Sequence, residues 1–183
     1  MILFYSLLDS EPKRNKFDAI RIKYAGLMYS VAYDIMQDSQ LAEDAVSEAY
    51  IKIIKNIDNI FDISGNKTRS YIVIIVRSVC FDLLRKEKRQ TGEYFGEIDD
   101  FESCDTPALE NMVISEACDL IAAHIKSLPK HYADTLYLHL VCEMPYERIA
   151  ELLGISEATA RTRVSRGKAK LRELLTKEGI TNE

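Results

Sequence analysis

Apolar side chains recur at helical intervals along most of this chain. Between residues 17 and 35 they lie three or four positions apart, which is the stripe of an amphipathic helix. A second stripe runs from Ala42 to Ile57, and either Asp38 or Ser39 is placed to cap the helix that carries it. Residues 59–67 contain Gly, Ser and Asn, so we expect a loop after the second helix.

The next stretch has a composition that fits two kinds of structure. Residues 72–76 are all β-branched, and taken alone they are also compatible with a buried strand. From Ile72 to Leu83, however, apolar residues keep a spacing of three and four, and residues 85–89 place cations where a helix C-terminus favours them. We therefore predict a third helix that begins near Thr68.

The second half of the chain separates into a connector and further helical stretches. The connector, residues 90–112, holds Gly, Pro and clustered acids and shows no sustained periodicity. Helical patterns then cover residues 114–127, 129–141, 145–153 and 156–177. Only seven Gly and four Pro occur in 183 residues, which leaves few turn signals for a β-rich fold. We predict an all-α fold with two helical modules.

Charge divides the chain at the same places. The net charge is -5, yet residues 13–89 and 119–183 are both basic on balance. Residues 90–118 contain eight acidic residues and no Lys or Arg. We therefore predict domains at residues 1–89 and 119–183 that are joined by an acidic linker at residues 90–118. The acidic average does not exclude nucleic-acid binding, because it combines unlike parts.

The sequence shows no recognisable catalytic or metal-binding motif. The four cysteines lack CxxC spacing and the three histidines form no zinc-ligand pattern, so we expect buried free thiols, no metal and no cofactor. No phosphate-binding loop, nucleophile motif or recognisable carboxylate pair supports an enzyme. The apolar stretch 1–8 is too short to span a bilayer and has no basic leader, so we expect a packed first segment of a cytoplasmic protein.

The sharpest local signal lies between residues 145 and 166. A short helix with Ile149, Ala150 and Leu153 facing inward is followed by Gly154 at a turn and by Ser156 as the N-cap of the next helix. This is the arrangement of a helix-turn-helix, whose second helix enters the major groove of DNA.

The second helix of this motif is strongly basic. Its cations are Arg161, Arg163, Arg166, Lys168, Lys170 and Arg172, and no acid interrupts them. Such density suits phosphate neutralisation together with readout of guanine edges by selected Arg side chains. The alternative is a solvated face or a protein contact. The basic end of the third helix, taken by itself, is more typical of dipole and solubility chemistry.

Taken together, these segments resemble the sigma-70 family of RNA polymerase sigma factors, and specifically its short extracytoplasmic-function group. The resemblance spans about residues 17 to 178. Residues 42–50 (AEDAVSEAY) are similar to the family's core-binding helix, and residues 76–85 (VRSVCFDLLR) to the DNA-facing segment that follows it. Leu128-Pro129 begins the second region, and residues 159–168 (TARTRVSRGK) are similar to its recognition helix.

The resemblance implies a factor that binds core RNA polymerase and directs promoter recognition and transcription initiation. The first region is implied to bind the polymerase clamp helices and the minus-ten element, and the second region the flap tip and the minus-thirty-five element. The residues implied at the polymerase clamp are Asp44, Ser47 and Glu48. Those implied at the minus-ten element are Asn66, Lys67, Arg69, Arg77, Ser78, Arg85, Lys86 and Arg89. Those implied at the minus-thirty-five element are Arg161, Thr162, Ser165, Arg166 and Lys168.

Five positions depart from the family pattern. They are Ser47 for Gln, Ser78 for Asn, Arg148 for Glu, Ala160 for Val and Gly167 for Ala. Since Ser reaches less far than Asn, minus-ten readout is expected to depend more on the loop before the third helix. Gly167 inside a helix costs about 1 kcal/mol relative to Ala, and the sequence offers no reason for it.

The expected partners are core RNA polymerase and promoter DNA, with an anti-sigma factor left open and no membrane insertion. In the family, the segment that corresponds to the acidic linker threads the basic channels of the polymerase; a solvated linker is the equal alternative. The competing function is a stand-alone helix-turn-helix regulator with a ligand-sensing N-terminal domain, which would bind DNA without polymerase. A helical adaptor or anti-factor that uses the basic helix on protein is a third possibility.

Overall fold

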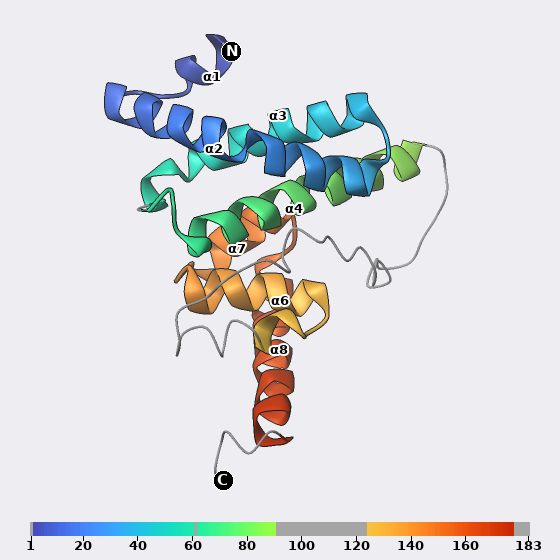
Figure 1. Cartoon of the computed structure of the whole chain (residues 1–183). Coiled ribbons are helices and arrows are strands. Elements are labelled where there is room, and N and C mark those ends of the chain that lie inside the picture. The colour runs from blue at the N-terminus through green and yellow to red at the C-terminus, as the bar shows by residue number, and fades with distance from the viewer. Residues whose placement is uncertain (1, 61, 91–123, 178–183) are drawn as a thin grey trace. The chain divides into compact units, whose positions relative to one another are not determined.

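The computed structural model describes residues 2–60, 62–90 and 124–177 (Figure 1). Every regular element in these ranges is a helix, which confirms the predicted all-α class. None of these helices is long and apolar enough to cross a membrane. The chain forms two compact units, whose described parts are residues 2–90, without residue 61, and residues 124–177. The predicted acidic linker falls almost wholly outside the described residues.

Three long helices build the first unit. They are α2 (Glu11–Met36), α3 (Ser39–Lys55) and α4 (Asn66–Gln90), and each packs against the other two. The short α1 (Ile2–Ser6) precedes them, and a 3-10 turn, η1 (Ile57–Asn59), follows α3. All three helices predicted from the apolar spacing are therefore present, with the first one starting earlier than its stripe.

The turn between α2 and α3 shows why the second helix starts where it does. Gln37 adopts a left-handed conformation with φ 53°, and its N–H donates to the Tyr33 carbonyl at 2.9 Å. Asp38 then accepts a hydrogen bond from the Leu41 N–H at 2.9 Å. Of the two predicted caps, Asp38 is the one used, because its carboxylate satisfies a backbone donor that the first turn leaves without a partner.

The β-branched stretch 72–76 lies within α4, so the helical prediction is confirmed. Ile72, Ile75 and Val76 have no exposed surface. β-Branched residues have only a weak preference against the helix, and packing against α2 and α3 outweighs it.

An aromatic cluster attaches the N-terminal segment to this unit. The ring of Phe4 lies 5.8 Å from that of Phe17 and 5.7 Å from that of Tyr50, centroid to centroid, and Phe17 is fully buried. Leu8 is 3% exposed. Phe4 and Leu8 thus pack against the first unit, as expected for a packed first segment.

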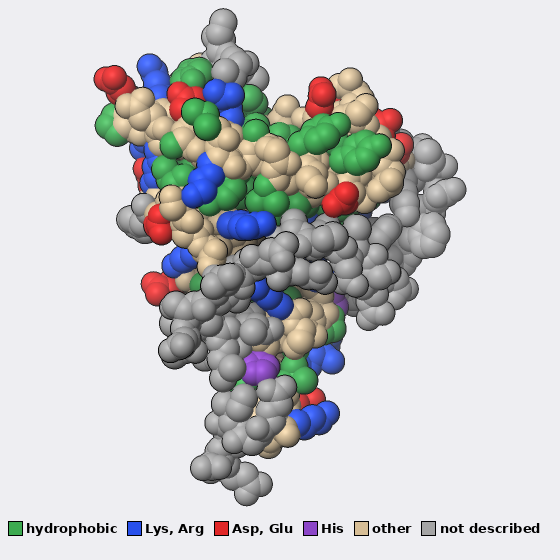
Figure 2. Space-filling model, viewed as in Figure 1, with side chains coloured by type: hydrophobic (Ala, Val, Ile, Leu, Met, Phe, Trp, Pro, Cys, Tyr) green, Lys and Arg blue, Asp and Glu red, His purple; other side chains and the backbone are tan. Residues whose placement is uncertain are grey.

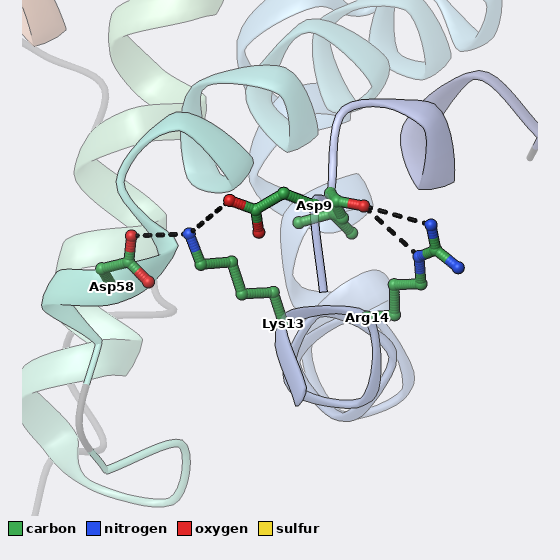
Figure 3. Close-up of polar contacts among 5 residues, drawn as sticks. Asp9, Lys13, Arg14 and Asp58 are labelled. Carbon is green, nitrogen blue, oxygen red and sulfur yellow. Dashed lines mark hydrogen bonds and ion pairs between the residues drawn. The ribbon is translucent and has the colours of Figure 1, made fainter. Parts of the chain in front are cut away.

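Polar contacts close the turn between α1 and α2 (Figure 3). The Lys13 ammonium lies 3.3 Å from the Asp9 carboxylate and 3.0 Å from that of Asp58 on η1. Hydrogen bonds to Asp58 and Asp9 raise the pKa of Lys13. The Arg14 guanidinium donates twice to the Leu8 carbonyl, at 3.2 and 3.3 Å. These contacts hold the start of α2 next to the end of α3.

The second unit is a group of shorter helices around α8 (Glu157–Lys177), which packs against α6 (Lys130–Leu136) and α7 (Tyr146–Leu153). Between α6 and α7 the chain makes a π-helical turn, η3 (Tyr137–Val141). The sequence predicted one continuous helix over residues 129–141, and the structure differs from Tyr137 onward. Of the helix predicted at 114–127, the described residues 124–126 are helical and residues 114–123 lie outside the described part.

Candidate nucleic-acid and polymerase interfaces

The predicted helix-turn-helix is present in the second unit. Gly154 ends α7 with φ 63°, a conformation that glycine adopts without the strain of a side chain. The Ile155 N–H donates back to the Ala150 carbonyl at 3.1 Å, and Ser156 Oγ accepts from the Thr159 N–H at 3.1 Å. As the sequence predicted, Gly154 therefore ends α7 and Ser156 caps the start of α8.

The inward face of α7 differs by one position from the prediction. Ile149 and Ala150 are buried as expected, but Leu152 is 3% exposed and Leu153 is only half-buried. In a helix of eight residues, the side that meets α8 is selected by the angle of the turn, and periodicity alone does not give that angle.

The two sides of α8 have opposite characters. Ala160, Val164, Gly167 and Leu171 are buried at intervals of four, three and four. All five residues predicted to face the minus-thirty-five element are exposed, namely Arg161, Thr162, Ser165, Arg166 and Lys168. Arg163, which the sequence counted among the cations, is half-buried. The structure thus brings the five predicted residues together on the solvent side of one helix.

Gly167 is explained by a close approach of two helices. A Cβ atom built on Gly167 would lie 2.7 Å from Leu136 Cδ1 and 2.9 Å from Leu136 Cγ. Leu136 on α6 is fully buried, so it has little freedom to move aside. The absence of a side chain at 167 lets α8 lie against α6 at the point where its outer side carries the basic residues.

The exposed cations of α8 differ in how they are held. Arg166 and Lys168 make no hydrogen bond, ion pair or ring contact within the described part of the chain. Arg161 instead donates to Glu157 Oε1 from Nε at 3.1 Å and from Nη2 at 2.6 Å. The Thr162 hydroxyl donates to the Ala158 carbonyl of its own helix at 2.9 Å.

The polar side of α3 carries the residues predicted to contact the polymerase clamp. Asp44 and Ser47 are exposed, and the side chain of Glu48 retains 46% of its accessible surface. The Glu48 carboxylate lies 4.0 Å from the Lys86 ammonium on α4. A predicted polymerase contact and a predicted DNA contact therefore lie side by side.

A second ionic link joins the same two helices. Asp82 on α4 lies 3.4 Å from the Lys52 ammonium on α3 and 2.9 Å from the Arg85 guanidinium. The three side chains are about three-quarters buried. Because a partly buried carboxylate interacts more strongly than an exposed one, this pairing holds Arg85 more firmly than Glu48 holds Lys86.

Three hydrogen bonds hold the loop before α4. The Tyr24 hydroxyl on α2 donates to the Ile63 carbonyl at 2.6 Å, and the Thr68 hydroxyl donates to the Asp62 carbonyl at 2.5 Å. Asp62 Oδ1 accepts from the Ser64 N–H at 2.8 Å. Burial, with a smaller effect of the nearby Asp62 carboxylate, raises the pKa of the Tyr24 hydroxyl, which is a proton donor at neutral pH even without this shift.

This anchored loop leads into the predicted minus-ten residues. Asn66 and Lys67 are the first residues of α4 and are exposed, while Arg69 is half-buried one turn on. At the other end of α4, Lys86 and Arg89 are exposed. The structure places these two groups at opposite ends of one long helix.

Two predicted minus-ten residues lie between those ends and have little exposed surface. Arg77 is 4% exposed and Ser78 is 8% exposed. The neighbouring residues 71–76 and 79–80 are buried as well. The family resemblance implied that Arg77 and Ser78 face DNA, so their exposure is lower than expected, and their contact with DNA stays a prediction.

Lys and Arg do not form one continuous patch on the visible face of the first unit. In the upper half of Figure 2, their side chains alternate with acidic and apolar ones. In α8, by contrast, the bases follow one another along a single helix. The cations on the visible face of the first unit are thus interspersed with acidic residues, whereas no acidic residue lies between Arg161 and Arg172 on α8.

Sequence reasoning did not identify three residues that shape these surfaces. Asp82 binds two cations, Glu157 pairs with Arg161, and the ring of Tyr146 lies 4.7 Å from the Arg161 guanidinium carbon. The four-residue spacing of Glu157 and Arg161 was a usable signal for an ion pair. Nothing in the sequence indicated that Tyr146 would meet Arg161, because that contact depends on the turn between α7 and α8.

Two family models match separate parts of this chain. Residues 22–90 match the family model of sigma-70 region 2, and residues 119–171 match that of sigma-70 region 4. The RNA polymerase sigma factor SigZ of Bacillus subtilis (strain 168) is 31% identical over 140 residues, which cover 76% of each chain. The ECF RNA polymerase sigma factor SigW of the same organism is 30% identical over 166 residues, covering 83% of this chain and 84% of the relative.

Among solved structures, the sigma factor RpoE from Bartonella quintana, crystallised with the anti-sigma factor NepR, covers 85% of this chain and 94% of its own. Its sequence identity is 19% and its TM-score 0.36, a likeness too weak to place individual elements. The family assignment rests on the two matched regions and on relatives that align over most of their length. This chain belongs to the sigma-70 family of RNA polymerase sigma factors, in its extracytoplasmic-function (ECF) group.

Proposed function

We propose a division of promoter binding between the two units of this sigma factor. As a member of its family the chain binds core RNA polymerase and directs promoter recognition and transcription initiation. In our proposal residues 1–89 bind the polymerase clamp and the minus-ten element, and residues 119–183 bind the flap tip and the minus-thirty-five element. Residues 90–118 connect them and run through the basic channels of the polymerase, where eight acidic residues stand in for nucleic acid.

One observation carries the proposal most directly. The helix after the helix-turn-helix corner buries an apolar side and exposes an opposite side that carries the predicted minus-thirty-five residues. Arg166 and Lys168 have no competing partner within the described residues, so DNA contact costs them no existing interaction. In recognition helices the N-terminal half reaches base edges, and this favours Arg161, Thr162 and Ser165 as readers beside Arg166.

The first unit supports a different mode of contact. We assign Asp44, Ser47 and Glu48 on α3 to the polymerase clamp, because they share the polar side of α3 and carry negative or small polar groups. We assign the start of α4 and its basic end to the minus-ten element. The residues at the two ends are Asn66, Lys67, Arg69, Arg85, Lys86 and Arg89, and we also assign Arg77 and Ser78, which lie between the ends with little exposed surface.

The charge of the whole chain makes promoter binding conditional in this proposal. With a net charge of -5 the free factor binds DNA poorly, and polymerase has to hold both basic surfaces on one promoter at once. We propose that the protein is not itself an enzyme and acts in the cytoplasm. An anti-sigma factor is a further candidate partner, which would occupy the same surfaces.

Reconstituted transcription with purified core polymerase tests the proposed function. The factor is expected to yield promoter-specific transcripts with core polymerase, and DNA binding of the free factor is expected to be weak and strongly salt-dependent. Tight, operator-specific binding without polymerase, together with no stimulation of transcription, would contradict the proposal and favour the stand-alone regulator.

A further inference from the structure

The guanidinium group of Arg161 is held by hydrogen bonds along one edge and by an aromatic ring against its face. Its Nε and Nη2 atoms donate to a single carboxylate oxygen of Glu157, at 3.1 and 2.6 Å. Its guanidinium carbon lies 4.7 Å from the centroid of the Tyr146 ring, within the range of a cation–π contact. The remaining nitrogen, Nη1, makes no hydrogen bond or ion pair within the described part of the chain. The guanidinium is therefore oriented while still having free donors.

The Tyr146 ring that supports Arg161 is itself held in place. His139 stacks on it, with ring centroids 4.7 Å apart and planes 22° from parallel. The Tyr146 hydroxyl lies 3.4 Å from His139 Nε2, and His139 Nδ1 lies 3.2 Å from the carbonyl of Met144. Met144 is 7% exposed, and its N–H donates to the Leu138 carbonyl at 3.0 Å. The support thus extends from an exposed arginine into the buried part of the second unit.

The backbone explains how the stack arises. His139 lies in η3, where the chain switches from α-helical to π-helical bonding. A π-helical turn changes the direction in which the following side chains point, and such turns occur frequently at functional sites. Tyr146 is the first residue of α7, whereas Arg161 is on α8, so the helix-turn-helix corner brings the ring and the guanidinium together.

We infer that Tyr146 is a positioning residue for promoter readout, which holds Arg161 so that its free guanidinium donors face the acceptor atoms of a guanine in the minus-thirty-five element. The inference rests on the proposed placement of α8 in the major groove. Binding to a base fixes a flexible arginine at a cost in conformational entropy, and prior support by Tyr146 and Glu157 lowers that cost. Arg166 has no such support within the described residues.

The test measures affinity of the holoenzyme, assembled from core polymerase and the full-length factor, for promoters changed singly at each minus-thirty-five position. Arg161→Ala identifies the position that Arg161 reads. Tyr146→Leu, which removes the aromatic face, is expected to reduce discrimination at that same position by about two- to fivefold. Tyr146→Phe keeps the ring and is expected to retain discrimination. In an Arg161→Ala background, Tyr146→Leu is expected to have no further effect.

Each outcome has a distinct meaning. If Arg161→Ala leaves discrimination unchanged at every position, the proposed base contact is wrong. If Arg161→Ala abolishes it at one position while Tyr146→Leu does not reduce it there, only the positioning role is wrong. An equal loss at all positions for Tyr146→Leu, with a lowered melting temperature, would show a merely structural ring and would also overturn the inference.

Two further variants keep the test decisive if Tyr146→Leu does not fold. His139→Leu removes the stacking partner but leaves the Tyr146 ring, and a smaller loss at the same promoter position is expected. Glu157→Gln removes a negative charge near DNA, so it is expected to raise affinity for every promoter while reducing discrimination at that position. Uniform changes in both variants, with no effect specific to that position, would contradict the inference.

Discussion

The two units hold their basic residues in different ways. In the first unit, Arg85 and Lys86 are paired with Asp82 and Glu48. In the second unit, Arg166 and Lys168 on α8 have no partner within the described residues. Arg85 and Lys86 therefore have to exchange internal partners for DNA phosphates, whereas Arg166 and Lys168 are already available.

This difference matches what each surface is proposed to do. A surface that binds polymerase and DNA side by side benefits from acids between its bases, because they prevent tight binding to DNA alone. A recognition helix that reads a duplex benefits from free donors such as those of Arg166 and Lys168, since no internal pair has to be broken before they meet DNA. In this proposal the first unit contacts DNA only together with polymerase, whereas α8 contacts the duplex directly.

The largest expected effect concerns direct DNA contact by α8. Arg166→Ala should cost about 1 to 3 kcal/mol of holoenzyme affinity and relax base choice at one minus-thirty-five position. Lys170→Ala and Arg172→Ala, in the second half of the basic run, should weaken all promoters alike and lower the salt slope by about one per contact. A panel of singly changed promoters at several salt concentrations measures both. Equal weakening of every promoter by Arg166→Ala would make Arg166 a backbone anchor.

The packing of the two units can be compared with a matched pair of glycine variants. Gly167→Ala should destabilise the second unit by about 2 kcal/mol, because the new Cβ overpacks against Leu136. Gly26→Ala on α2 should instead stabilise the first unit by about 0.5 to 1 kcal/mol, since a Cβ there meets nothing within 4 Å and Ala favours the helix. Thermal unfolding of both variants measures the difference. Stabilisation by both would contradict the close approach of α6 and α8.

A charge reversal on α3 tests the proposed contact of the first unit with polymerase. Glu48→Lys should weaken binding to core polymerase about tenfold, roughly 1.4 kcal/mol, by repulsion from a basic partner surface, and should leave helical content unchanged. The matched control is Glu43→Lys, an exposed position on the same helix outside the predicted contact set. Competition against another sigma factor measures the affinity. If the two variants bind core polymerase equally well, the assignment of Glu48 is wrong.

The smallest expected effect concerns the ion pairs themselves. Asp82→Asn should lower the stability of the first unit by about 0.5 to 1 kcal/mol and raise holoenzyme affinity for all promoters slightly, because it releases Arg85 and Lys52. Glu151→Gln breaks the more exposed pair with Arg148 in the second unit and should change neither quantity measurably. Denaturant unfolding and salt-dependent binding check both. A decrease in promoter affinity for Asp82→Asn would show that Asp82 orients Arg85 for DNA.

The amino-acid sequence was sufficient to predict the three long helices of the first unit and the helix-turn-helix, but not the π-helical turn at Tyr137–Val141. Apolar periodicity is a local property, so the stretch 72–76 could be assigned to a helix from its continuation alone. Gly154 and Ser156 act through hydrogen bonds to residues within five positions, which is why the corner could be located in advance. The residues on the exposed side of α8 were expected from the resemblance to the family and not from spacing. The roles of individual residues in DNA and polymerase binding stay predictions.

The tertiary structure decided the features that depend on residues far apart in the sequence. Asp82 meets Lys52 across 30 positions, and the ring of Tyr146 meets Arg161 because the corner folds α7 towards α8. Gly167 had no explanation until Leu136 was found against it. The low exposure of Arg77 was equally invisible in the sequence. Helix spacing determines which side of a helix is apolar, whereas only packing determines which neighbour that side meets and which charges are left free.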